Sequence, residues 1–170
     1  VKDDGTTTAL LDDAYTVDSY DLLDDHTVIF VGFKMDKVLW KYRQLFTLDL
    51  HNGSVKCVYD KQDADISKVF VLDGVVYAMV NFGKDYGAME QPKIYTFNDG
   101  KFTFVVDAFY SLRNSVGSDC RLGKQISTQK INGSMYFLMT KVDTSVLVRF
   151  KGSTIEEVAK TNGSIDGYTY

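Results

Sequence analysis

Two kinds of turn recur along this chain at nearly matched intervals, and this repeat constrains the fold more than any other feature of the sequence. The first kind lies at His26, Gly74 and Gly133, which are 48 and 59 residues apart. The second kind contains Gly53, Gly100 and Gly152, which are 47 and 52 residues apart. Two independent markers with similar spacing indicate a structural repeat rather than a chance similarity.

The residues between these turns have the composition of β-strands. Short runs of β-branched and aromatic residues are bounded by Asp, Asn and Gly, which is a strong local signal for hairpins. The run after each turn of the first kind is apolar on successive residues, at 28–31, 75–80 and 135–139. This pattern is typical of a strand that is covered on both faces. The next run alternates, so that Phe46 and Leu48 flank Thr47.

The length of the repeat is close to that of WD40 and kelch units, which are four-stranded blades of β-propellers. The sequence therefore predicts an all-β fold with three four-stranded antiparallel blades at residues 17–60, 66–107 and 125–160. Residues 1–12 are interpreted as the end of a preceding blade and residues 163–170 as the start of a following one. Because closed propellers need four to eight blades, we expect a partial β-propeller domain, a fragment of a longer ring.

The charged and apolar residues exclude several classes of partner. The 19 Lys and Arg are scattered among 23 Asp and Glu, whereas nucleic-acid binding needs clustered basic side chains. No apolar run approaches the roughly 20 residues that cross a bilayer. Cys57 and Cys120 lie 63 positions apart, without the spacing of a metal site or a disulfide framework. We expect a soluble cytoplasmic protein with buried free thiols and without cofactor or metal.

No pattern in the sequence indicates a catalytic residue. The nearest approach to a serine-hydrolase elbow is Gly-Ser-Asp-Cys at residues 117–120, which lacks the second glycine and has no His after it. His26 and His51 fall at expected turns. The carboxylate pairs are at residues 12–13, 24–25 and 156–157. We interpret the second as part of a turn and the third as part of an outer strand, where solvation accounts for both.

Three Asn-Gly-Ser tripeptides, at Asn52, Asn132 and Asn162, allow two interpretations. They match the acceptor pattern for N-glycosylation. Asn-Gly also supplies the two positive-φ residues of a type I′ hairpin turn. Because the repeat places turns at Asn52 and Asn132, we favour the type I′ turn at these two positions.

Asp119 and Arg121 lie just before the third expected blade, in a long connection at residues 108–124. We expect a structural ion pair between them that fixes this connection. An arginine that faces a ligand in a central channel is the alternative.

Three segments together carry a family resemblance. They read Leu-Phe-Thr-Leu-Asp-Leu at 45–50 before Gly53, Ser-Asp-Cys-Arg-Leu-Gly at 118–123, and Asn-Gly-Ser-Met-Tyr-Phe-Leu at 132–138. In this order they resemble the propeller domain of the prolyl oligopeptidase family, especially its acylaminoacyl-peptidase-like branch. The resemblance covers most of residues 17–170, although the segment 159–163 keeps only part of the family pattern.

The resemblance implies a non-catalytic propeller that belongs to a serine peptidase. Such a propeller restricts the access of short or N-blocked peptides to a C-terminal α/β-hydrolase domain. The partners would then be this domain and the peptide substrate. The catalytic triad would lie beyond Tyr170, so no catalytic residue of the family is assigned to this chain.

Two other functions are consistent with the sequence, since propellers host many unrelated functions. One is a non-enzymatic interaction propeller, either TolB-like or a scaffold. The other is a small lectin-like or glycan-active propeller. Open blade edges and apolar end faces also predict self-association of the chain.

Overall fold

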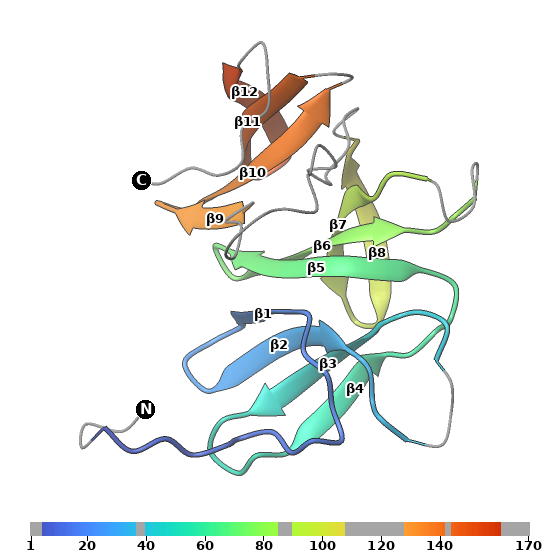
Figure 1. Cartoon of the computed structure of the whole chain (residues 1–170), viewed down its shortest axis with the longest axis vertical. Helices are drawn as coiled ribbons and strands as arrows, with labels where there is room; N and C mark the ends of the chain where they lie inside the picture. The colour runs from blue at the N-terminus through green and yellow to red at the C-terminus, as the bar shows by residue number, and fades with distance from the viewer. Residues whose placement is uncertain (1–4, 37–39, 85–89, 108–127, 142–143, 161–170) are drawn as a thin grey trace, which may run out of the picture.

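The computed structural model describes residues 5–36, 40–84, 90–107, 128–141 and 144–160. Within these ranges the chain forms twelve strands, and the strands build three four-stranded antiparallel sheets (Figure 1). The same ranges contain no helix of the length and hydropathy needed to cross a membrane. The expected all-β architecture and the three sheets are confirmed.

Each sheet is built from four strands that are consecutive along the chain. The first contains β1 (Ser19–Leu22), β2 (Thr27–Gly32), β3 (Gln44–Asp49) and β4 (Val55–Tyr59). The second contains β5 (Asp65–Leu72), β6 (Val75–Asn81), β7 (Lys93–Asn98) and β8 (Lys101–Val106). The third contains β9 (Thr128–Ile131), β10 (Ser134–Lys141), β11 (Thr144–Lys151) and β12 (Thr154–Lys160). Every strand pairs with its neighbour in sequence, so each sheet is a meander.

Three hairpin turns have the geometry expected of Asx-Gly pairs. Asp73, Asp99 and Asn132 have φ angles of 50°, 47° and 48°, and the glycine after each has a φ of 75°, 71° or 69°. Two successive positive φ angles define the type I′ turn, whose twist matches that of the strands it joins. The expected type I′ turn at Asn132 is confirmed.

The expectation of a type I′ turn at Asn52 is wrong. Gly53 has a positive φ of 71°, but Asn52 does not, and the hairpin loop is longer. The N–H of Gly53 donates to the carbonyl of Asp49 at 2.9 Å. The Asp49 carboxylate accepts the N–H groups of His51 and Asn52 at 2.8 and 3.3 Å. Asp49 thereby stabilises a loop that needs left-handed backbone only at its glycine.

The three sheets stack face to face through two apolar interfaces. Between the first and second sheets the buried residues include Ile29, Val31, Leu45, Val69, Val71 and Ala78. Between the second and third sheets they include Phe70, Tyr77, Met79, Phe137, Val148 and Phe150. Strand β6 is buried from Val76 to Val80, which confirms that an unbroken apolar run marks a strand covered on both faces.

Residues 5–18 cross the outer face of the first sheet, the face turned away from the second sheet (Figure 1). Leu11 and Tyr15 pack there against Phe30 and Phe46. The N–H of Thr16 donates to the carbonyl of Phe33 at 2.9 Å, which ties the segment to the end of β2. Residues 5–12 contain no strand; because residues 1–4 lie outside the described residues, the outer hairpin expected over residues 1–12 stays a prediction.

Several expected features lie outside the described residues. These are residues 1–4, the long connection at 108–124 with Asp119 and Arg121, and the start of a following blade at 163–170. They stay predictions.

Candidate functional site

The strands β1, β5 and β9 each form one edge of their sheet, and side chains connect them to one another. Strand β1 lies against β5. The hydroxyl of Ser19 donates to the carbonyl of Val69 at 3.2 Å and accepts the N–H of the same residue at 3.1 Å. Lys68 of β5 donates to the hydroxyl of Thr128 in β9. We call these three strands the inner strands.

Asp21 of β1 joins all three sheets. One carboxylate oxygen accepts the N–H of Val71 in β5 at 2.8 Å. Both oxygens lie 2.7 Å from the ammonium nitrogen of Lys130 in β9. Lys130 also donates to the carbonyl of Val71 at 3.4 Å. The Asp21 side chain is only 17% exposed, so these bonds replace most of the water that would otherwise solvate it.

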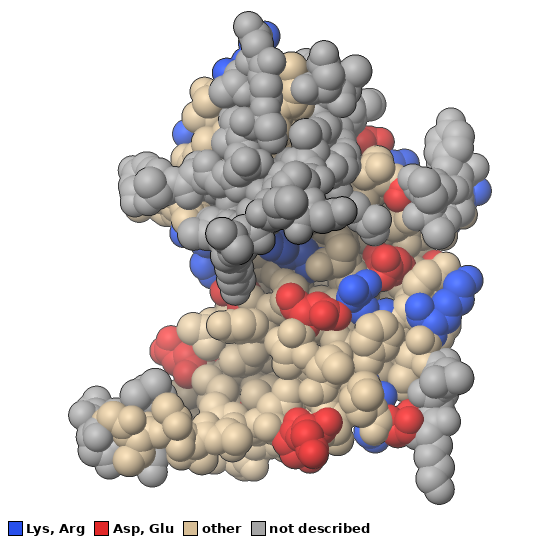
Figure 2. All heavy atoms as spheres, viewed as in Figure 1, with Lys and Arg blue, Asp and Glu red and all other residues tan. Residues whose placement is uncertain are grey.

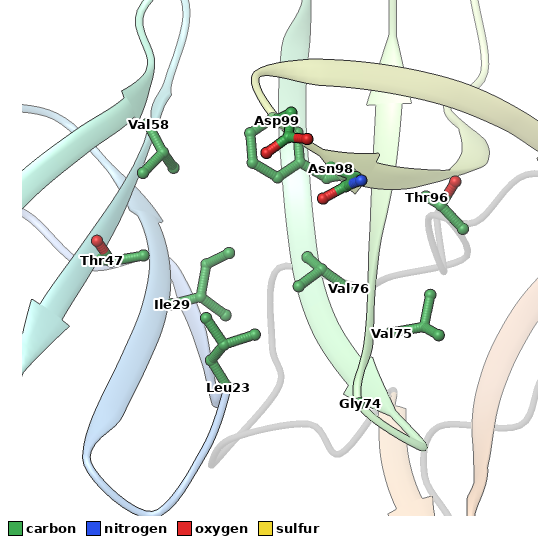
Figure 3. Close-up of a pocket in the computed structure, with 11 residues that line it drawn as sticks. Leu23, Ile29, Thr47, Val58, Gly74, Val75, Val76, Thr96, Asn98 and Asp99 are labelled. Carbon is green, nitrogen blue, oxygen red and sulfur yellow. The ribbon is translucent and has the colours of Figure 1, made fainter.

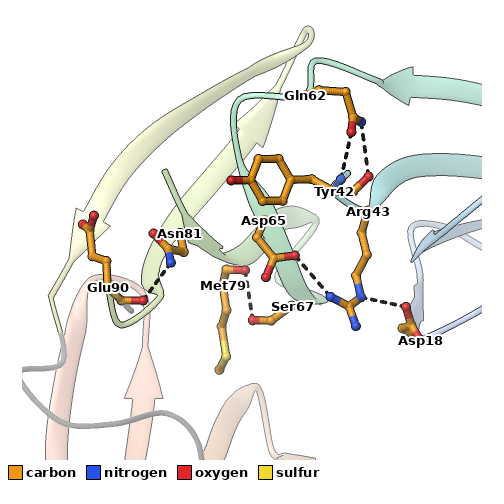
Figure 4. A network of polar contacts seen from close by, with 9 residues as sticks. All are labelled: Asp18, Tyr42, Arg43, Gln62, Asp65, Ser67, Met79, Asn81 and Glu90. Atoms are coloured by element: carbon orange, nitrogen blue, oxygen red, sulfur yellow. Dashed lines mark hydrogen bonds and ion pairs between the residues drawn. The ribbon is translucent and has the colours of Figure 1, made fainter. Parts of the chain in front are cut away.

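A second polar cluster lies where the first sheet meets the start of β5 (Figure 4). The Arg43 guanidinium contacts the carboxylates of Asp18 at 2.7 Å and Asp65 at 3.2 Å. Burial alone would lower the pKa of Arg43, but the hydrogen bond and charge of Asp18, with the added charge of Asp65, raise it above its ordinary value. Arg43 thus stays cationic and holds two acidic segments together.

Next to this cluster, Gln62 holds the loop that precedes β3 (Figure 4). Its side-chain oxygen accepts the N–H of Tyr42 at 2.8 Å, and its side-chain nitrogen donates to the carbonyl of the same residue at 3.2 Å. The amide side chain thereby imitates the backbone of a neighbouring strand.

The carboxylates of Asp18, Asp21 and Asp65 all accept hydrogen bonds from cationic side chains or backbone N–H groups. Charge-assisted bonds of this kind hold a carboxylate in a fixed orientation. The arrangement therefore suits them to holding the sheets together.

An apolar groove of about 520 Å³ opens between the first and second sheets (Figure 3). Its walls are apolar on both sides, with Leu23, Ile29 and Val58 from the first sheet and Val76 from the second. The polar side chains of Thr47, Thr96, Asn98 and Asp99 also line it. This volume is within the range of small-molecule and side-chain pockets, and an apolar lining with a few polar groups is typical of them.

No family model and no curated protein matches this sequence. The candidate site therefore rests on the geometry of the inner strands and of the groove.

The structure places several residues singled out from the sequence at the expected kinds of position. His26 and His51 lie at hairpin turns, with ring centroids 4.2 Å apart. Asp24 accepts the N–H of His26 at 2.8 Å, and this bond is the main reason that the pKa of Asp24 is lowered. Glu156 lies on the outer strand β12 and pairs with Arg149 at 2.6 Å. The described residues contain no group of three metal-ligating side chains.

The expected burial of Cys57 is wrong, because this residue is exposed on the outer strand β4. Cys120 lies outside the described residues.

The sequence did not single out Asp21, Arg43 or Lys130. Asp21 lies between Tyr20 and Leu22 in a short strand, and Lys130 lies beside Ile131 in another; an isolated charge in such a strand is the signal that could have identified them.

Proposed function

We propose that this chain is the non-catalytic part of a β-propeller and serves as an interaction module. In this proposal the groove between the first and second sheets receives an apolar group of the partner. The groove carries the proposal, because its apolar walls end in the side chains of Asn98 and Asp99, which can orient a bound group.

Two further observations support this function. The three consecutive meanders stacked face to face have the arrangement of successive propeller blades. In addition, the inner-strand carboxylates are engaged in bonds between sheets, so they support a rigid frame on which a binding site can be built.

A titration of isotope-labelled protein with N-acetyl amides of Leu, Phe and Trp tests the groove. We expect saturable NMR shift changes centred on Thr47, Val76 and Thr96. The Thr47→Phe variant fills the groove and should weaken binding about tenfold or more, since it occupies the space of the ligand. Thr103→Phe, at an exposed position of β8 that does not line the groove, is the matched control. Shifts that persist unchanged in Thr47→Phe would contradict the proposal.

The family resemblance supports a more specific candidate within the same class. The chain would be the propeller of an acylaminoacyl-peptidase-like serine hydrolase and would limit access to the separate hydrolase domain. The specific observation is that the first motif of the resemblance, at residues 45–53, lies in β3 and the following hairpin loop, as a blade-closing strand pair would. Labelling of the full-length natural protein with a fluorophosphonate, which modifies activated serine nucleophiles, tests this candidate. A full-length protein without a labelled serine would contradict it.

A further inference from the structure

The outer face of the first sheet exposes apolar side chains at positions that are buried in the second sheet. In each of these two sheets the first strand pairs with the second strand in the same register. Tyr20 and Leu22 of β1 therefore occupy the positions that Val69 and Val71 occupy in β5. Val69 and Val71 are 2% and 7% exposed because they pack against the first sheet. Tyr20 and Leu22 are 70% and 54% exposed. The repeat therefore provides a sheet-packing face here, and nothing in the described residues covers its inner end.

Tyr20 and Leu22 are also two of the eight large apolar side chains that are most exposed in the described part of the chain. We call these two residues the outer apolar patch. Exposed apolar side chains concentrated in one short stretch of a folded chain are typical of interaction surfaces.

Acidic side chains accompany the outer apolar patch. Residues 5–33 contain six Asp and neither Lys nor Arg. Asp18 and Asp21 pair with Arg43 and Lys130. The others are exposed and form no ion pair within the described ranges; they are Asp12, Asp13, Asp24 and Asp25. Figure 2 shows the lower part of the molecule, where the first sheet lies, as mostly uncharged surface with red carboxylate residues at several places and blue basic residues at the right.

We propose that the outer apolar patch binds a partner polypeptide that presents an apolar β-sheet face flanked by Lys or Arg. The sheet form follows from the equivalent positions of the second sheet, which are covered by a sheet face. The basic flanks follow from Asp24 and Asp25, which lie in the turn directly after Leu22, since complementary charge speeds and orients association. A second copy of this chain would instead bring two acidic surfaces together, which like-charge repulsion disfavours.

This surface is separate from the groove, so the inference goes beyond the proposed function and the two can fail independently. The groove is lined by residues on the other face of the first sheet, such as Ile29 and Thr47. Tyr20 and Leu22 do not line it.

Two designed β-hairpin peptides with the same Val and Tyr residues test the proposal, one with Lys and one with Glu at the remaining strand positions. Their binding to the whole chain is measured by fluorescence anisotropy at low and high salt. We expect the Lys hairpin to bind and the Glu hairpin not to bind. Binding of the Lys hairpin should weaken as salt screens the carboxylates. Truncating exposed anchor residues, in the double variant Tyr20→Ser and Leu22→Ser, should weaken it by about tenfold or more.

Two further variants separate the apolar and the acidic contributions. Phe104→Ser removes a side chain of similar exposure, 55%, from β8 and should leave binding unchanged. The double change Asp24→Asn and Asp25→Asn should weaken binding of the Lys hairpin and reduce its salt dependence. Circular dichroism confirms that each variant is folded.

Three outcomes would overturn the proposal. One is equal binding, or no binding, of the Lys and Glu hairpins. Another is an equal loss in Phe104→Ser and in the Tyr20 and Leu22 double variant. The third is a dimer of the natural chain in analytical ultracentrifugation that the double variant abolishes, because a second copy would then occupy the patch.

Discussion

Lys130 and Asp21 form an ion pair although 109 residues separate them, and the ammonium nitrogen of Lys130 lies 2.7 Å from both carboxylate oxygens. The pair connects the third sheet directly to the first, while the second sheet packs against both. One carboxylate, that of Asp21, therefore forms hydrogen bonds that join all three inner strands. This contact adds a long-range connection to a stack that otherwise joins only neighbouring sheets.

Replacing Asp21 by Ala should destabilise the fold by about 1–3 kcal/mol, because the N–H of Val71 loses its acceptor and Lys130 loses its partner. Lys130→Met should cost less than about 1 kcal/mol, since the Lys130 side chain is 43% exposed and the pair is partly screened by water. Urea unfolding measures both changes. Lys151→Met, at an exposed position of β11, is the control, and an Asp21→Ala cost no larger than that of the control would contradict this view.

Gly32→Ala should release residues 5–18 from the first sheet. An added Cβ at Gly32 would lie 1.9 Å from the carbonyl oxygen of Thr16, so the segment must move away. We expect a loss of about 1–3 kcal/mol, the usual range for overpacking. Amide exchange should also accelerate at Thr16, whose N–H donates to Phe33. Val17→Ala, at an exposed position in the same segment, should change neither quantity appreciably.

Two phenylalanines test where the stability of the stack resides. Phe150 is fully buried between the second and third sheets, so Phe150→Ala should cost about 3–5 kcal/mol. Phe104 is 55% exposed on β8, and Phe104→Ala should cost less than about 1 kcal/mol because surface substitutions away from the core change stability little. Thermal and urea unfolding compare the two. Similar losses would show that the interface between these sheets is not a main source of stability.

The stability of the fold should fall in alkali, in part because of Tyr59. Burial, with help from Asp63, raises the pKa of the Tyr59 hydroxyl above its ordinary value of 10.0. The folded state therefore holds this proton more tightly than the unfolded state. The stabilisation is complete below about pH 10 and is lost as the pH rises through the higher pKa of the folded state.

Tyr59→Phe tests this pH dependence. The variant should lose about 1 kcal/mol at neutral pH, since the hydroxyl donates to the Asp63 carboxylate at 2.6 Å. Its stability should then decline less steeply above pH 10 than that of the natural chain. Tyr77 and Tyr95, whose pKa values are also raised mainly by burial, preserve part of the decline. Parallel curves for the two proteins in urea unfolding from pH 7 to 11 would contradict the assignment to Tyr59.

Local patterns were enough to predict the strands and most of the turns. Asn132-Gly133 adopts the left-handed backbone that Asn-Gly favours, and Phe46 and Leu48 share one face as their alternation predicts. Both features depend on residues that are close in sequence. The turn at Asn52 was predicted less well, because the Asp49 carboxylate supplies hydrogen bonds that the Asn-Gly pair alone does not reveal.

The contacts between sheets could not be predicted in the same way. Asp21 and Lys130 meet only because three sheets stack in a particular order, and the spacing of residues within one repeat carries no information about that order. The groove has the same origin, since its two walls belong to different sheets. The path of residues 5–18 depends on the packing of Leu11 and Tyr15 against Phe30 and Phe46. A segment without regular secondary structure has no sequence pattern that predicts this contact.

The covering of the first sheet by Leu11 and Tyr15 has a consequence for assembly. Sheets that pack face to face can continue from one molecule to the next, and a head-to-tail contact of this kind that does not close produces filaments. With Leu11 and Tyr15 in place, the centre of the first sheet is not available for such a contact. Open-ended polymerisation is thereby opposed, while Tyr20 and Leu22 stay accessible at the edge.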